Sequence, residues 1–125
     1  MVAINTFIYF IIALGLFEIV SNLFHLLRGS KESIGLSAKK QHQELSLDLG
    51  YIHFYVKAII MFVFGLLFTA SGFMALLENN YLFLELVLGL FALYGIIQAF
   101  FYTRPYKVWM SLVVYILPII ILLFL

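Results

Sequence analysis

Four long runs of apolar residues constrain this chain of 125 residues more than any other feature. The runs cover residues 4–27, 52–77, 81–102 and 108–125. A transmembrane α-helix needs roughly 20 consecutive apolar residues, because it rises about 1.5 Å per residue through a hydrocarbon core about 30 Å thick. Each run is about that long or longer, so the sequence predicts four transmembrane helices.

The composition also favours a membrane protein over a soluble one. Hydrophobic residues make up 66% of the chain and charged residues 10%, whereas soluble domains average about 45–50% and about 25%. The formal net charge of +1 is too small to indicate nucleic-acid binding. We therefore expect one integral membrane domain over residues 1–125, with the lipid bilayer as its surroundings and no nucleic-acid partner.

Short connectors separate the last three apolar runs. Residues 78–80 join the second run to the third, and residues 103–107, which include Pro105, join the third to the fourth. Connectors this short place consecutive helices side by side and antiparallel. The predicted fold class is an all-α, four-helix transmembrane bundle with up-down neighbours. The polar segment 28–51 starts with turn-like residues 29–33 and has helical composition from Ser37, so we expect an interfacial helix or an extension of the second transmembrane helix.

The positions of the basic residues predict how the chain is oriented. They lie in or beside two of the connecting segments, and they are Arg28, Lys31, Lys39, Lys40, Lys57, Arg104 and Lys107. Cytoplasmic loops carry an excess of Lys and Arg. We therefore expect loops 28–51 and 103–107 to be cytoplasmic and both termini to lie outside, in an inner or plasma membrane. Aromatic residues near the same boundary agree with this orientation: Tyr51, Tyr55, Tyr102, Tyr106 and Trp109.

Polar side chains gather in the half of the predicted helices that lies nearer to the cytoplasmic loops. Glu18, Asn22 and His25 are spaced by four and three residues, so they share one helix face. A charge at the bilayer centre costs roughly 2.5–3.5 kcal/mol on insertion scales, so such residues face the bundle interior. We therefore expect an intramembrane cleft that opens to the cytoplasm. Its predicted lining residues are Glu18, Asn22, His25, Lys57, Tyr94, Gln98 and Tyr115.

Two interpretations of this cleft stay open. Glu18 and Lys57 could form a structural ion pair, or the cleft could bind or conduct an ion, a proton or a small amphiphile. The second interpretation makes the chain a non-catalytic protein without a cofactor. Gly65, Gly72, Gly89 and Gly95 favour close helix packing, within the chain or between chains. A homo-oligomer, or an accessory subunit of a larger membrane complex, is therefore an alternative.

The histidines raise a further alternative, a membrane enzyme that acts on lipid or quinone. His25 and His53 end at similar depth on antiparallel helices, and His42 lies about three turns before His53 if that helix is continuous. Imidazoles placed in this way could bind haem iron or a divalent metal. The chain contains no HExxH motif, phosphate loop or nucleophile elbow, and no cysteine. These absences favour a non-catalytic protein.

Overall fold

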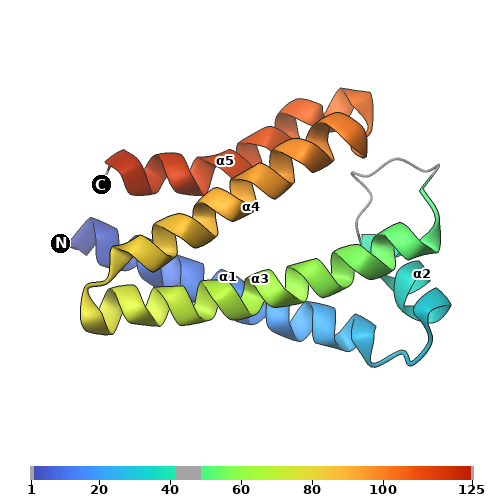
Figure 1. The fold of residues 1–125 in the computed structure, drawn as a ribbon, viewed down its shortest axis with the longest axis horizontal. Coiled ribbons are helices and arrows are strands. Elements are labelled where there is room, and N and C mark those ends of the chain that lie inside the picture. The colour runs from blue at the N-terminus through green and yellow to red at the C-terminus, as the bar shows by residue number, and fades with distance from the viewer. Residues whose placement is uncertain (1, 42–48, 125) are drawn as a thin grey trace.

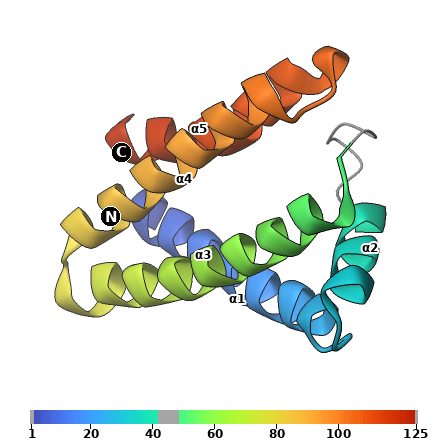
Figure 2. The same cartoon turned by 45° about the vertical axis from the view of Figure 1, so that its right-hand side comes forward.

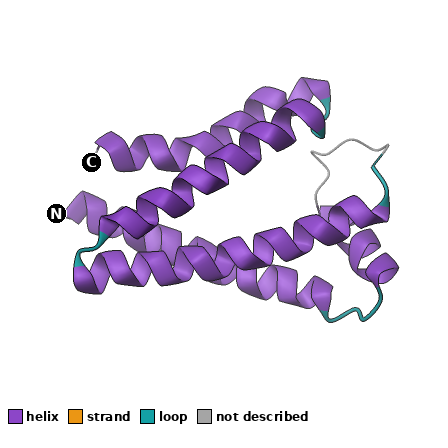
Figure 3. Cartoon of the chain, in the orientation of Figure 1, coloured by secondary structure: helices purple, strands orange, loops and turns teal. Residues whose placement is uncertain are grey.

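A computed structural model describes residues 2–41 and 49–124, which form helices and no strands (Figures 1 and 3). The elements are α1 (Val2–Leu26), α2 (Lys31–Gln41), α3 (Tyr51–Glu78), α4 (Tyr81–Phe101), a 3-10 turn η1 (Pro105–Lys107) and α5 (Val108–Phe124). The helices α1, α3, α4 and α5 supply four segments that are long and apolar enough to cross a membrane. The all-α fold class is confirmed, and the observed ends of these helices lie within two residues of the predicted ones.

The ends of the long helices follow from local backbone chemistry. Asn79 ends α3 in the left-handed conformation, with φ of 54°, and the N–H of Asn80 donates to the carbonyl of Met74 at 3.3 Å. Asparagine adopts this conformation more readily than most residues, which makes it a suitable helix terminator. Pro105 cannot continue α4, and it begins the 3-10 turn that leads into α5.

The segment before α3 forms a separate helix, so the alternative of an extended α3 is wrong. Ser30 caps α2, because its hydroxyl oxygen accepts the N–H of Ser33 at 3.1 Å. The helix therefore starts inside the stretch 29–33 that the sequence suggested was a turn. Ile34 and Ala38 of α2 pack against Phe54 of α3 in a small apolar cluster. Extended backbone at Gly50 precedes α3.

The helix α3 is the centre of the molecule. The helices α1, α2 and α4 pack against it, and α5 packs on α4. Both chain termini and the α3–α4 turn lie at one end of the molecule, whereas α2 and the α4–α5 turn lie at the other, here called the α2 end (Figure 1). Two views show the α4–α5 pair diverging from the α1–α3 pair toward the α2 end (Figures 1 and 2). Neighbouring transmembrane helices are antiparallel, as predicted.

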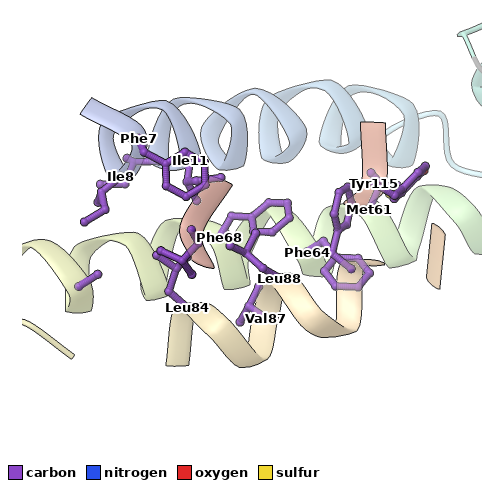
Figure 4. Close-up of a cluster of buried hydrophobic side chains, with 14 residues drawn as sticks. Phe7, Ile8, Ile11, Met61, Phe64, Phe68, Leu84, Val87, Leu88 and Tyr115 are labelled. Carbon is purple, nitrogen blue, oxygen red and sulfur yellow. The ribbon is translucent and has the colours of Figure 1, made fainter. Parts of the chain in front are cut away.

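Two features hold the helices together. At the α1–α3 crossing the backbones touch, since a Cβ added to Gly65 would lie 2.9 Å from the carbonyl oxygen of Gly15. The main apolar core fills the space between the two helix pairs. It extends from Ile8, near the N-terminus, to Phe64 and Tyr115 (Figure 4). Lys57 and Gln98 are buried beyond this core, toward the α2 end.

Candidate functional site

A buried lysine joins three helices beside the apolar core. The Lys57 side chain is 1% exposed, and its Nζ donates to Oε1 of Gln98 on α4 and to the hydroxyl of Tyr115 on α5. The distance from Nζ to the Tyr115 oxygen is 3.3 Å. Nζ also lies 5.8 Å from the ring centre of Tyr94, within the range of a cation–π contact. We call Lys57, Tyr94, Gln98 and Tyr115 the Lys57 cluster.

The sequence around each of these residues explains its position. Lys57 belongs to the buried face of α3 with Phe54 and Met61, at intervals of three and four residues. Gln98 follows Gly95 by one turn on the buried face of α4. Any side chain at Gly95 would overlap the ring of Tyr115. The absence of a Cβ there lets Tyr115 lie against α4, from where its hydroxyl reaches Lys57.

Two further buried polar atoms lie close to the cluster. Nε2 of Gln98 and Oγ of Ser111 have no hydrogen-bond partner in the described part of the chain. Ser111 is 4% exposed and precedes Tyr115 by one helical turn, on the same face of α5. An amide nitrogen and a hydroxyl can both donate hydrogen bonds. Both atoms therefore have an unused capacity to donate within the described residues.

Aromatic rings close the cluster on the side of the chain termini. The ring of Phe91 packs on Tyr115 with centroids 4.6 Å apart, and the ring of Phe64 lies 6.0 Å from that of Tyr94. Phe64 and Phe91 also contact each other edge to face at 5.3 Å. The sequence suggested an open cleft, but Lys57, Gln98 and Tyr115 are buried. Aromatic rings pack against these residues on the side of the chain termini, and a cleft that opens to the cytoplasm stays a prediction.

The predicted residues of α1 make their own contacts. Asn22 is 1% exposed, and its Nδ2 donates to both the side-chain Oε2 and the backbone carbonyl of Glu18, at 2.9 and 2.8 Å. The spacing of four residues allows this hydrogen bond within one helix. Glu18 itself is half-buried. A contact between Glu18 and Lys57 stays a prediction.

The predicted metal ligands have different surroundings. His25 is 8% exposed, and its Nδ1 lies 2.7 Å from the hydroxyl of Ser37, which ties α1 to α2. His53 packs against the ring of Tyr102, with centroids 4.5 Å apart. His42 lies outside the described residues. Within residues 2–41 and 49–124, no group of three or more His, Asp and Glu side chains could hold a metal ion. A haem or metal site stays a prediction.

The sequence left some residues of this region out of the predicted site. Ser111 lies four residues before Tyr115, a spacing that places both on one helix face, and Ser37 pairs with His25 from a helix whose position the sequence did not predict. A scan of protein-family models and searches of curated proteins and of solved structures each find no match to this chain.

Proposed function

We propose that this chain forms a single, non-catalytic membrane domain in which the Lys57 cluster binds a small ion or amphiphile through an anionic group. The observation that carries the proposal is the buried amine of Lys57, which donates to Gln98 and Tyr115, together with buried donors on Gln98 and Ser111 that lack partners within the described residues. A buried polar group without a partner costs about 1–3 kcal/mol. Ionisable residues inside membranes often belong to ligand or ion sites. A bound acceptor oxygen would remove these costs.

The chemistry of the cluster favours an anion over a cation. A metal or organic cation would be repelled by the ammonium of Lys57, whereas a carboxylate would accept from it and from the Gln98 amide. Aromatic rings separate the cluster from the end of the molecule where the chain termini lie, so they block passage of a ligand in that direction. This arrangement supports binding rather than conduction through the bundle.

We propose that the ligand enters from the α2 end, on the cytoplasmic side. The basic residues of the chain lie near that end, so both basic loops would face the cytoplasm by the positive-inside rule. At this end the α4–α5 pair lies away from α1 and α3 (Figures 1 and 2). Entry requires the contact between His53 and Tyr102 to open, since it joins α3 to the end of α4.

A thermal-shift experiment in detergent tests this function with three probes: octanoate, acetate and octyltrimethylammonium. A ligand that binds only the folded protein raises its stability by RT ln(1 + [L]/Kd). We expect octanoate, below its micelle concentration, to raise the melting temperature of the wild type and of Lys31→Met, but not of Lys57→Met. Lys31 is the matched control because it is exposed. An equal response to octanoate and to octyltrimethylammonium, or an undiminished response of Lys57→Met, would refute the proposal.

A specific observation on α5 favours a second candidate function, that of an assembly subunit. Only 17% of the α5 segment is buried within the chain, against 39% for α3 and 44% for α4. Lipid alone can cover an apolar helix face, but so can a helix of a second chain. Purification in mild detergent should then yield a stoichiometric complex or a homo-oligomer. A monodisperse monomer would count against this candidate.

A further inference from the structure

A shallow, open groove lies between the end of α1 and α2, and none of the Lys57 cluster residues lines it. Val20 and Phe24 line it from one face of α1, at an interval of four residues, and Arg28 lines it from the turn that follows α1. Lys40 and Ser37 of α2 line the opposite side. The groove therefore has an apolar part within the predicted transmembrane segment and a basic part at the end of that segment.

The apolar part of the groove is open to the surroundings. The side chain of Val20 is 68% exposed and that of Phe24 is 62% exposed. In a membrane Val20 lies at the depth of the acyl chains and Phe24 lies nearer the headgroups, because they precede the end of α1 by six and two residues. An acyl chain would cover them and extend directly from a headgroup at Arg28.

The basic part is suited to a phosphate group. The Arg28 guanidinium lies 5.1 Å above the centre of the Phe24 ring. Contact with a ring face leaves donors in the plane of the guanidinium, and that plane is the geometry in which arginine binds phosphate. Lys40 adds a second cation across the groove. Between residues 28 and 40 the chain has four basic residues and one acidic residue, Glu32, so the local charge favours an anion.

Contacts around the groove fix the position of α2 relative to α1. The hydrogen bond between His25 and Ser37, at 2.7 Å, joins α1 to α2 directly below the basic residues. An adjacent face of α2 packs on α3 through Ile34 and Ala38. Because α2 contacts both α1 and α3, Lys40 of α2 keeps a defined position relative to Arg28.

We propose that this groove binds one anionic phospholipid, with its phosphate between Arg28 and Lys40 and an acyl chain along Val20 and Phe24. Charge complementarity argues for the anionic headgroup, and the exposed apolar wall next to the cations argues for a lipid rather than free phosphate. The site does not depend on the Lys57 cluster, so Lys57→Met should leave lipid binding intact. Failure of one proposal is therefore distinguishable from failure of the other.

Native mass spectrometry on full-length protein tests the lipid site. The protein is reconstituted in phosphatidylcholine bilayers that contain phosphatidylglycerol, extracted in mild detergent, and scored for the ratio of the two lipids it retains. One cation near a headgroup contributes about 1 kcal/mol, or about a fivefold change in affinity. We expect the wild type to retain phosphatidylglycerol preferentially, Arg28→Gln to lower this preference about fivefold, and Arg28→Gln with Lys40→Gln to lower it further.

Matched variants distinguish a specific lipid-binding site from general electrostatic attraction between anionic lipids and basic residues. Lys31→Gln removes the same charge from α2, but Lys31 does not line the groove, so its lipid preference should equal that of the wild type. Arg28→Lys keeps the charge and should retain most of the preference. Circular dichroism of each variant checks that the helices are intact. If Lys31→Gln and Arg28→Gln weaken retention equally, the proposal is overturned.

A second experiment tests whether the groove binds a lipid headgroup or a free phosphate ion. Lipid-free protein in detergent is titrated with inorganic phosphate, and retained phosphatidylglycerol is challenged with the same ion. We expect millimolar phosphate neither to shift the melting temperature through Arg28 nor to displace the lipid, because the ion lacks an acyl chain for Val20 and Phe24. Displacement of the lipid by phosphate at these concentrations would show a phosphate site and overturn the lipid proposal.

Discussion

Lys57 shows how a single side chain can be accommodated inside an apolar bundle. Its ammonium has an amide oxygen, a phenol oxygen and the face of a tyrosine ring as neighbours. Hydrogen bonds to charged groups contribute about 1.5–3 kcal/mol each, more than those between neutral groups. The three neighbours come from α4 and α5, so the lysine of α3 links the two helix pairs near the α2 end.

This linkage predicts strong coupling between Lys57 and Gln98. Gln98→Leu should lower the free energy of unfolding by about 3 kcal/mol, because it leaves a buried charge with fewer partners. Lys57→Met should lower it by about 1–3 kcal/mol, because the Gln98 amide then loses its donor. The double variant should be more stable than the sum of the two losses implies. Unfolding in mixed micelles measures each value, and strictly additive losses would contradict the linkage.

At this scale the sequence predicted part of the site. The cost of placing a lysine in hydrocarbon predicts that Lys57 faces the interior, and helical spacing places Gln98 and Tyr94 on one face of α4. Helical spacing also places Asn22 four residues from Glu18 on one face of α1, where it donates to Glu18.

At the scale of the helices, the α1–α3 crossing is determined by backbone contact between Gly15 and Gly65. Helix lengths were predictable because each depends on a local run of apolar residues. The divergence of α4 and α5 from α1 and α3 was not, since it depends on which small residues meet across a crossing. The separate helix α2 also depends on tertiary packing, through Ile34 and Ala38 against α3.

The tight α1–α3 crossing predicts that alanine substitution has different effects on the free energy of unfolding at Gly65 and at Gly89. Gly65→Ala should lower the free energy of unfolding by about 1–3 kcal/mol, because its Cβ would lie 2.9 Å from the Gly15 carbonyl oxygen. Gly89→Ala should be neutral or stabilising by up to about 1 kcal/mol, since the nearest atom to its Cβ is Cδ1 of Ile119 at 4.0 Å. Equal losses for the two variants in mixed-micelle unfolding would show that the crossing is not tight.

At the scale of the whole molecule, the fold places the basic loops at one end and the chain termini at the other (Figure 1). The positive-inside rule then predicts the side of the membrane on which each end lies. The chain contains no cysteine, so introduced cysteines report their position without background. Asn80→Cys should be labelled by an impermeant maleimide from outside intact cells, and Ser30→Cys only after lysis. Labelling of Ser30→Cys in intact cells would reverse the proposed orientation.

We propose that Lys57 is enclosed within the bundle and serves as the anchor for an anionic ligand. Nitrogen-15 NMR of the lysine side chains in micelles is a test of both parts, because a buried ammonium exchanges its protons with water slowly whereas exposed lysines exchange rapidly. We expect one slowly exchanging signal that is missing in Lys57→Met and that shifts when octanoate is added. A Lys57 signal that exchanges as fast as those of the exposed lysines and does not respond to octanoate would contradict it.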